Sequence, residues 1–446
     1  MEVTSILNYI KMIKRRLYSD LLRWKNSHRR KPLLLQGARQ VGKTFLVSEF
    51  GNNEYNHFIY LNFEQNPRLS TLFDDELDPE IIIQNLSLFV GQKITSENTL
   101  IFFDEIQVAE KALKSLKYFN EKAPEYHIIA AGSLLGVSIG KSISFPVGKV
   151  NFMHMHPVSF VEYLEAAGES LILNEYSEFH KMEKIPDIVH EKLLRHLKIY
   201  LFLGGMPEVV YEYLNRENIV TTREIQIEII EAFSRDFSKY ADNTLALKNT
   251  EVWESIPWQL ARENKKFQYT AIKGNARSST HKLAIEWLKS AGLIYQVNQI
   301  STPKLPLSGY ANGSVFKIYM MDVGLLGALL KIQPAIIIDP IAIFQEYNGA
   351  FTENFVATQL AIKRAGELYY WTSRSDAEVD FIIEKNNKLV PVEVKSGLSR
   401  KKHSLLSYNE KYQPEILYRL SPRNYEKQGN FINLPLYSVN FLNDCQ

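Results

Sequence analysis

The sequence predicts an α/β fold whose N-terminal part is built on a parallel sheet, followed by a mostly helical segment and two smaller modules. The first observation behind this prediction is the apolar run at residues 33–35, which leads directly into Gly-Ala-Arg-Gln-Val-Gly-Lys-Thr at residues 37–44. The second is the apolar run at residues 100–103, which ends in Asp104 and Glu105. Helical and strand patterns alternate to about residue 150, as a parallel sheet with crossover helices requires.

Residues 37–44 have the G-x-x-x-x-G-K-S/T spacing of a phosphate loop that follows a buried strand and opens a helix. Gly37 and Gly42 tolerate the backbone angles that turn N–H groups towards phosphate oxygens, and the helix N-terminus adds partial positive charge. Lys43 would neutralise the β- and γ-phosphates of ATP, and the Thr44 hydroxyl would bind Mg²⁺. The alternative is a glycine turn before an ordinary helix. The expected ATP-binding residues are Gly37, Ala38, Arg39, Gln40, Val41, Gly42, Lys43, Thr44 and Phe45.

The acidic pair after the second apolar run is the element that a phosphate loop needs to bind Mg²⁺ and to hydrolyse a nucleotide. Asp104 would hold Mg²⁺ through water, and Glu105 would polarise the attacking water in a hydrolase. The alternative is a solvated strand end. A third apolar run, residues 127–131, ends at Gly132 and Ser133. Ser133 would bind the γ-phosphate or the water, and a turn-forming serine is an equal alternative.

Length and composition fit a multi-domain cytoplasmic protein. A chain of 446 residues corresponds to roughly two to four domains, each large enough for its own core. The single cysteine, Cys445, excludes an intramolecular disulfide and a cysteine-based metal site. No apolar run approaches the ~20 residues of a membrane span, and the order of basic and apolar residues at the start is the reverse of a signal peptide. Because the net charge is only +2, nucleic-acid binding would depend on local basic patches.

Two helical regions flank the predicted sheet. Residues 1–30 read as an amphipathic helix whose Arg and Lys side chains form a solvated face. Residues 155–240 read as mostly helical, with Tyr, Leu and Phe at helical spacing. Gly204-Gly205-Met206-Pro207 interrupts this segment, which predicts a hinge or a tight helix junction.

Residues 250–330 read as helix, strand, loop and strand, the order of a winged-helix module. A helix is expected from residue 278, with strands at residues 292–297 and 315–320 on either side of a Pro/Gly-rich loop. If this is a recognition helix, most of its contacts would go to DNA phosphates. The equal alternative is a protein-interaction module. The side chains that would face DNA are Lys273, Arg277, His281 and Lys282.

A C-terminal hairpin carries the second candidate for chemistry. If Glu384 lies opposite Leu389 across a turn of residues 385–388, counting places Asp380 opposite Glu393. Opposed residues share a face of the sheet. Lys395 lies on the same face by the period of two. The hairpin therefore predicts an Asp, a Glu and a Lys within reach of one metal ion.

Glu353 lies on an apolar helical face, where an unpaired carboxylate would be costly, and supplies a fourth group. The set Glu353, Asp380, Glu393 and Lys395 resembles the PD-(D/E)XK nuclease superfamily over roughly residues 340–420. The resemblance implies that the acids hold Mg²⁺ and that the lysine positions or activates the water that cleaves a phosphodiester. Val379 stands where that family has proline. The alternatives are a hairpin with a solvated charged face and a nuclease-like fold that is catalytically silent.

Four segments together resemble the AAA-type, STAND-related bacterial ATPases that have a C-terminal domain of unknown function. These are residues 37–44, Asp104-Glu105-Ile106-Gln107, Ser-Phe-Pro-Val-Gly-Lys at residues 144–149, and Gly-Gly-Met-Pro-Glu at residues 204–208. The resemblance spans nearly the whole chain. It implies ATP binding and hydrolysis, and it assigns the helical segment to a lid that follows the ATPase core.

The predicted architecture is a P-loop NTPase parallel sheet with a helical lid, then a winged-helix module and a small α/β nuclease-like domain. The expected function is a Mg²⁺-dependent ATPase that acts as a nucleotide-driven switch coupled to DNA binding, with or without DNA cleavage. The alternative is an ATP-gated DNA- or protein-binding regulator whose C-terminal domain is silent. A protein partner or a second copy of the chain also remains open. The candidate catalytic residues are Glu105, Lys43, Ser133 and Lys395, and Arg235 and Arg39 are candidates for an arginine finger. The expected boundaries are 1–30 for the N-terminal helix, 31–155 for the ATPase core, 156–245 for the lid, 246–335 for the winged-helix module and 336–446 for the nuclease-like domain.

Overall fold

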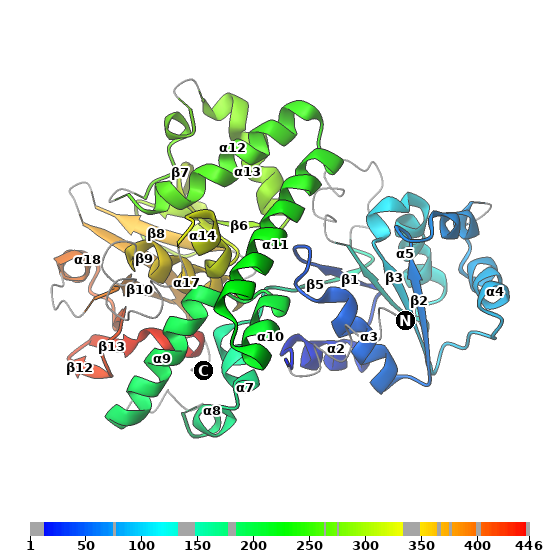
Figure 1. The fold of residues 1–446 in the computed structure, drawn as a ribbon, viewed down its shortest axis with the longest axis horizontal. Coiled ribbons are helices and arrows are strands. Elements are labelled where there is room, and N and C mark those ends of the chain that lie inside the picture. Colours follow the sequence, from blue (N-terminus) through cyan, green and yellow to red (C-terminus); the bar gives the residue numbers. More distant parts are fainter. Residues whose placement is uncertain are drawn as a thin grey trace. The chain divides into compact units, whose positions relative to one another are not determined.

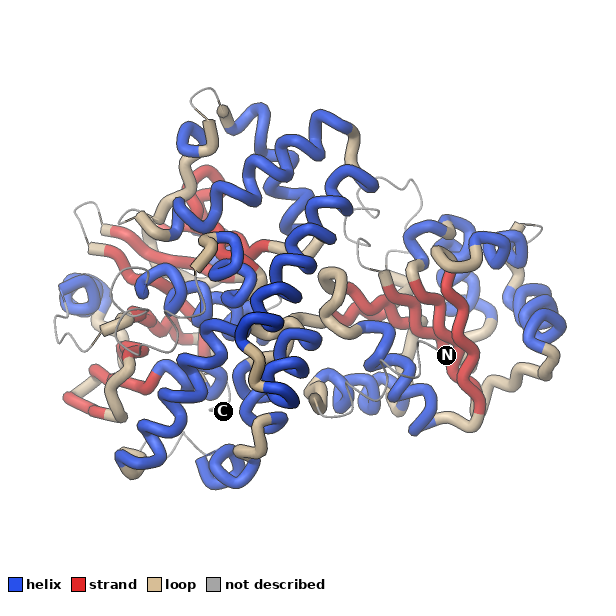
Figure 2. The backbone as a smooth tube through the Cα atoms, in the orientation of Figure 1, coloured by secondary structure: helices blue, strands red, loops and turns tan. Residues whose placement is uncertain are grey.

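The computed structural model of the chain describes residues 13–74, 77–132, 148–176, 184–262, 265–273, 276–332, 348–363, 367–373, 377–397 and 403–442. Ser133, residues 144–147 and Cys445 therefore lie outside the described residues. The chain divides into two compact units, residues 1–156 with 290–292 and residues 157–289 with 293–446. Each unit has its own β-sheet, and the strands of both sheets are red in Figure 2.

The first unit contains a five-stranded parallel sheet in the order β2-β3-β4-β1-β5. Helix α3 leads from β1 to β2, whereas α4 and α5 lead back towards β4 (Figure 1). Because crossovers between parallel strands are right-handed as a rule, these opposite directions place helices on both faces of the sheet. The elements are α2 (Leu17–Lys25), β1 (Leu33–Gln36), α3 (Lys43–Glu54), β2 (His57–Asn62), α4 (Pro79–Val90), β3 (Thr99–Asp104), α5 (Glu110–Lys122), β4 (His127–Ala131) and β5 (Asn151–His154).

The apolar strands explain why this sheet is covered on both faces. Every residue of β3 is buried, and in β4 only His127 is not fully buried. Such strands have no polar face for water, so helices must cover both sides. Because the strands are parallel, the carboxyl ends of β1 and β3 lie at the same edge of the sheet, where ligands of open α/β sheets bind. The predicted parallel α/β sheet is confirmed.

The second unit begins with the helices α7 (Phe160–Ala166), α8 (Ser170–Tyr176), α9 (Asp187–Leu203), α10 (Pro207–Arg216) and α11 (Ile219–Tyr240), so the segment is helical as predicted. Of these helices, α7 and α9 share a core with α17 (Asn348–Lys363). The Phe160 ring lies 5.4 Å from that of Tyr200 and 5.8 Å from that of Phe355, and the Phe160 N–H donates to Gln359 Oε1 at 3.0 Å. The helical segment is therefore part of the same unit as the C-terminal sheet.

The sheet of the second unit has eight strands in the order β12-β13-β11-β10-β9-β8-β6-β7, with both parallel and antiparallel neighbours. Adjacent residues of β8 face opposite sides. Tyr370 lies next to Lys317, while the Trp371 ring packs 5.1 Å from Tyr408 of α18. The remaining elements are α12 (Asn243–Leu260), α13 (Ser278–Ser290), β6 (Ile294–Ile300), β7 (Ala311–Met320), α14 (Val323–Leu329), β8 (Leu368–Thr372), β9 (Glu378–Lys385), β10 (Lys388–Val394), α18 (His403–Tyr412), β11 (Leu417–Ser421), β12 (Glu426–Gln428) and β13 (Phe431–Pro435).

The two strands that the sequence assigns to a wing do not form a separate module. Strands β6 and β7 pair with each other in antiparallel fashion, as the wing requires, but β6 also pairs with β8 in parallel. Four of the seven residues of β6 are buried, so this strand gains from a neighbour on each side. One sheet therefore takes the place of the predicted winged-helix module and the separate domain after residue 335. Among the described residues, no helix combines the length and apolar character that a membrane span requires.

Candidate functional site

The phosphate loop connects the end of β1 to the first turn of α3. Gly42 has a φ of +96°, in the left-handed region that favours glycine, and lies directly before α3. At Gly37 a side chain is excluded, because its Cβ atom would lie 2.3 Å from the carbonyl oxygen of Met155. The backbone therefore requires both glycines of the motif, and the loop ends at a helix N-terminus, where anions bind.

Lys43 brings a buried positive charge into this loop. The residue is 6% exposed, and its Nζ donates to the carbonyl oxygens of Gly37 at 2.9 Å and Ala38 at 2.8 Å. Burial lowers the pKa of Lys43 to about 8, against the opposing attraction of Glu105 and Asp104. Phosphate oxygens would stabilise an ammonium group that has lost its water.

Asp104 and Thr44 bring two oxygen ligands together beside Lys43. The Thr44 hydroxyl donates to Asp104 Oδ2 at 2.8 Å, and the Tyr60 hydroxyl donates to the same oxygen at 3.1 Å. Asp104 is 2% exposed, and burial together with the charge of Glu105 raises the pKa of its carboxyl group. A hydroxyl and a carboxylate are oxygen donors of the kind that Mg²⁺ prefers. Sequence reasoning missed Tyr60, which no motif marks.

Glu105 has a strained backbone at the position where a catalytic acid is expected. Its φ of +52° and ψ of +42° lie in the left-handed region, which is costly for a residue other than glycine. The Gln107 side-chain amide donates to Glu105 Oε2 at 2.5 Å and so holds the carboxylate. Gln107, the last residue of the Asp-Glu-Ile-Gln segment, therefore positions Glu105 through this hydrogen bond.

Three other predicted groups remain predictions. Ser133 lies outside the described residues. Arg39 is half-buried close enough to Lys43 for its charge to lower the pKa of Lys43. Arg235 is exposed on α11, with its guanidinium 3.4 Å from Glu231. Neither position identifies an arginine finger.

Arg15 ties the phosphate loop to the last residues of the first unit. Its guanidinium donates to the carbonyl oxygens of Val41 at 2.8 Å and His156 at 2.6 Å, and the residue is only 7% exposed. The Met155 N–H donates to the carbonyl oxygen of Gln36, at the end of β1, at 2.7 Å. The sequence predicts a solvated basic face before and within α2, but Arg15 is buried because it satisfies two backbone carbonyls.

In the second unit, the Gly204-Gly205 motif holds Val158, which lies at the start of this unit. The Val158 N–H donates to the Gly205 carbonyl at 2.6 Å, and the Gly205 N–H donates to Asp322 Oδ2 at 2.5 Å. A Cβ atom on Gly205 would lie 2.1 Å from the Val158 carbonyl oxygen, and one on Gly204 would lie 2.0 Å from Asp322. Burial raises the pKa of Asp322 to about 6. The motif forms the tight junction between α9 and α10 that the sequence predicts as one of two alternatives.

The C-terminal hairpin has the predicted register. Glu384 lies opposite Leu389, and the ladder continues to the pair Phe381 and Val392, one position before Asp380 and Glu393. The turn itself is Asn386-Asn387, with φ values of +50° and +57°. Two left-handed residues, here both Asn, are typical of the two-residue turn that matches the twist of antiparallel strands.

Two of the three C-terminal residues expected to bind metal, Glu353 and Asp380, lie together with Glu378 around a buried lysine on β7. Lys317 Nζ lies 2.5 Å from Glu378 Oε1, 3.8 Å from Asp380 Oδ1 and 3.9 Å from Glu353 Oε2. Glu353 also forms an ion pair with Lys265 and accepts the Tyr319 hydroxyl at 2.9 Å. Glu353 is thus paired at the apolar helical face, as its position requires.

Glu393 faces different partners from Asp380. Its Oε2 accepts Arg419 Nε and Nη2, each at 3.2 Å, and its Oε1 lies 3.2 Å from Lys395 Nζ. Arg419 lies opposite Glu393 in the parallel β10–β11 ladder, so the two share a face. Within the described part of the chain, no group of three or more His, Cys, Asp or Glu side chains is arranged to hold a metal ion. One metal ion at Glu353, Asp380 and Glu393 therefore stays a prediction, and in the structure cationic side chains pair with each of these carboxylates.

Sequence analysis does not single out Lys317, although its position within an apolar strand indicates a buried charge. A lysine in the run Phe-Lys-Ile-Tyr-Met at residues 316–320 lies inside an apolar strand, where a charge needs a partner. Period-two alternation places Lys317 and Tyr319 on one face. That face receives Glu353 from α17.

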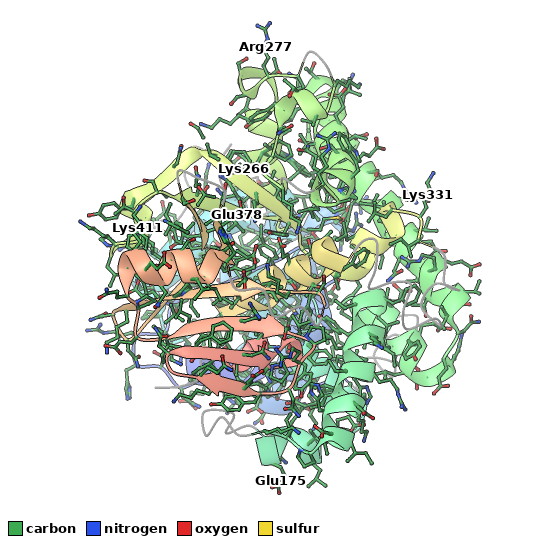
Figure 3. All side chains as sticks on the ribbon, turned by 90° about the vertical axis from the view of Figure 1, so that its left-hand side faces the viewer. Glu175, Lys266, Arg277, Lys331, Glu378 and Lys411 are labelled. Carbon is green, nitrogen blue, oxygen red and sulfur yellow. The ribbon has the colours of Figure 1, made fainter. Side chains whose placement is uncertain are left out.

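Two of the four side chains expected to face DNA contact the same carboxylate. His281 Nε2 lies 3.0 Å from Glu251, and the His281 side chain is only 8% exposed. Lys273 forms an ion pair with Glu251, but its side chain is 66% exposed. Burial therefore removes His281 from the side chains that could reach DNA, whereas Lys273 stays a prediction. Arg277 and Lys282 are exposed, and Figure 3 shows Arg277 extending away from the ribbon.

A parallel sheet with a phosphate loop after β1 and an acidic end on β3 defines the class of P-loop nucleotide-binding domains. Within that class, residues 29–164 match the family model described as an AAA domain, so this part of the chain is similar to AAA domains. Two domains of unknown function, DUF8612 and DUF4143, match residues 194–335 and 348–438. The eight-stranded sheet takes strands from both of these matched segments.

Several solved structures are similar to the chain at low identity. The Walker-type ATPase PABY2304 of Pyrococcus abyssi is 16% identical, with 71% of this chain and 96% of that chain covered and a TM-score of 0.45. The Orc1 protein of Aeropyrum pernix in complex with DNA is 14% identical, with coverages of 71% and 91% and a TM-score of 0.30. AMPPCP-bound DnaA from Aquifex aeolicus is 16% identical, with coverages of 62% and 87% and a TM-score of 0.24. A search of curated protein sequences finds no match. Similarity at this level bears on neither substrate nor partner.

Proposed function

We propose that the chain binds ATP at the phosphate loop and hydrolyses it in a Mg²⁺-dependent reaction. The observation that carries this proposal is the buried Lys43 ammonium at the N-terminus of α3, with the hydrogen-bonded pair Thr44 and Asp104 beside it. A nucleotide triphosphate supplies the negative charge that this lysine and helix end would stabilise.

Each side chain at the site has a task in this proposal. Lys43 binds the β- and γ-phosphate oxygens, and Glu105 accepts a proton from the attacking water. The hydrogen bond from Gln107 holds the Glu105 carboxylate in position. Bound Mg²⁺ would offset the charge on the phosphate oxygens, with Thr44 and Asp104 as its protein contacts. Ser133 is proposed to contact the γ-phosphate.

The decisive experiment compares ATP binding by wild type and Lys43→Ala, measured by isothermal titration calorimetry with Mg²⁺ present. Binding should be abolished in the variant, because water cannot replace the lysine charge in a buried loop. Lys25→Ala is a matched control, since Lys25 lies in the same unit but pairs with Glu54 at 3.5 Å. Equal affinity in wild type and Lys43→Ala would contradict the assignment.

Nucleotide binding is proposed to act as a switch through the connection between the units. Arg15 touches both the phosphate loop and His156, so a movement of the loop carbonyl of Val41 would change the support of the connecting segment. In the second unit, Gly205 and Asp322 hold the residues that follow. Arg15→Lys should preserve the charge but lose one of the two carbonyl contacts. Hydrogen exchange at residues 157–165 should respond to ATP in wild type and respond less in Arg15→Lys.

DNA is the partner proposed for the second unit, and the exposed Arg277 and Lys282 on and beside α13 support it. Contacts of this kind go to phosphates and are weakened by salt. Fluorescence anisotropy with duplex DNA should show ATP-dependent binding that falls in Arg277→Ala, while Lys411→Ala, an exposed lysine on α18, serves as control. No DNA binding in either nucleotide state would favour the alternative, an ATP-gated regulator that binds a protein.

The geometry of the C-terminal cluster favours a nuclease-like domain that is catalytically silent. Lys317 lies among the carboxylates that a nuclease would use to hold Mg²⁺. Incubation of the full chain with DNA, ATP and Mg²⁺ or Mn²⁺ should therefore yield no cleavage. Cleavage that disappears in Asp380→Ala would restore the nuclease alternative.

A further inference from the structure

We propose that Lys317 supplies, from within the chain, the positive charge that the carboxylates of Glu353, Glu378 and Asp380 would otherwise take from a divalent cation. Its Nζ lies between 2.5 and 3.9 Å from one oxygen of each carboxylate. An ammonium group is compact and has three N–H donors, so it can serve several carboxylates at once. Figure 3 labels Glu378, the cluster member that is most exposed.

The charge balance of the cluster supports this role. Three carboxyl groups face two ammonium groups, Lys317 and Lys265. Because burial and the charge of Glu353 raise the pKa of Asp380 to about 7, the cluster carries at most one net negative charge near neutral pH. A divalent cation added to the same carboxylates would be repelled by both lysines. Like charges at close range disfavour each other, most strongly where water is excluded.

The charge of Lys317 is also fixed in place by the chain, whereas a free metal ion could exchange with solvent. Lys317 belongs to the β6–β7 ladder, opposite Val297, and its side chain is 0% exposed. Its ammonium lies 5.0 Å from the centre of the Tyr370 ring, which adds a cation–π contact. The positive charge therefore stays in the second unit at any metal concentration, and the cluster should need no metal.

The test uses full-length chains that all carry Asp104→Ala, so that the phosphate loop contributes no Mn²⁺ site. Three proteins are compared: one with Lys317 retained, one with Lys317→Ala and one with Lys317→Met. Both substitutions remove the charge, but alanine leaves room for an ion whereas methionine fills it with an uncharged chain of similar length. Mn²⁺ binding is measured by electron paramagnetic resonance.

We expect one Mn²⁺ ion in the Lys317→Ala protein, bound at least about tenfold more tightly than in the Lys317→Met protein, and none at the cluster when Lys317 is present. Similar Mn²⁺ binding by the alanine and methionine variants would overturn the proposal. So would Mn²⁺ binding by the lysine-containing protein that is lost in Asp380→Asn.

If Lys317→Ala does not fold without metal, recovery of folded protein from urea is compared in Mn²⁺ and in EDTA by circular dichroism. Recovery that needs Mn²⁺ in the alanine variant alone supports the proposal, and failure in both media overturns it. The proposal is independent of ATP hydrolysis. An inactive ATPase would leave it standing, because no nucleotide enters the test.

Discussion

The two units each bury a lysine near acidic side chains, yet the two lysines differ in whether their charge is already paired. Lys43 donates to two backbone carbonyls, and burial lowers its pKa to about 8. For Lys317, burial alone would lower the pKa, but the charges of Glu353, Glu378 and Asp380 outweigh burial and raise it. One lysine has surplus positive charge for an anion, whereas the other is already neutralised.

The difference shows that residue types alone do not define a site. Both clusters contain a buried lysine, an aspartate and a glutamate, but the direct partners of the lysine differ. Carbonyl dipoles leave the Lys43 charge available, while three carboxylates with oxygens within 3.9 Å offset the charge of Lys317. A phosphate-binding site and a structural ion cluster can therefore be built from the same side chains.

The largest expected effect is a difference in the free energy of unfolding between variants of the two lysines. Lys317→Met should destabilise the second unit by about 3–5 kcal/mol, because it leaves buried carboxylates without their cation. Lys43→Met should cause no comparable loss, because it removes a buried charge that no carboxylate contacts directly. Urea unfolding gives the free energies, and hydrogen exchange of β7 and β9 locates the change. Equal losses in the two variants would erase the distinction.

The next effect concerns the acid beside Lys43. Glu105→Gln should retain ATP binding and slow hydrolysis by about 10²-fold or more, the scale of losing a positioned base. Phosphate release and nucleotide affinity are measured on the same preparation. Glu110→Gln is a suitable control, since Glu110 is an exposed acid that pairs with Lys114 on α5. Unchanged turnover in Glu105→Gln would reduce Glu105 to a strand-end acid.

Nucleotide binding should change the protonation of Lys43, and not that of Lys317, in a way that depends on pH. A lysine pKa that is lowered to about 8 in the folded chain costs stability below pH 8, and this cost is relieved as the pH rises towards the ordinary pKa. At pH 8.5 a large share of Lys43 is neutral, and a bound triphosphate favours the charged form. Binding of a non-hydrolysable ATP analogue should then take up roughly half a proton or more.

Calorimetry in buffers of different ionisation enthalpy measures this uptake. At pH 6.5 Lys43 is charged with and without nucleotide, so its contribution should vanish. An uptake that is the same at both pH values would mean that Lys43 does not titrate on binding.

The smallest effect is expected at Lys395. Its side chain is 38% exposed, and Arg419 remains on Glu393 when Lys395 is removed. Lys395→Gln should therefore cost no more than about 1 kcal/mol in urea unfolding. A loss as large as that of Lys317→Met would show that Glu393 depends on the exposed lysine.

Local rules were enough for the parts of the molecule that lie close together in sequence. The phosphate loop is one continuous segment whose glycines are required by its own backbone and by Met155, the residue that follows β5. The hairpin register followed from counting away from the turn, because the turn fixes which residues face each other. The expected turn spans residues 385–388, and the structure turns at Asn386-Asn387 instead, but the register is the same. The approach of Asp104 to Thr44 followed from the rule that parallel strands end at one edge of the sheet.

Only the tertiary structure decided which charges meet across distant segments. Lys317, Glu353 and Asp380 come from β7, α17 and β9, and no periodicity in one segment reveals the partner in another. The same holds for Glu251, which pairs with Lys273 and His281. It also holds for β6, which pairs with β8 as well as β7, so that the strands expected to form a wing belong to the C-terminal sheet. The sequence by itself determined that a phosphate loop forms and that buried charges need partners. Long-range packing determined which partner each charge has, because burial makes pairing compulsory but does not specify the pair.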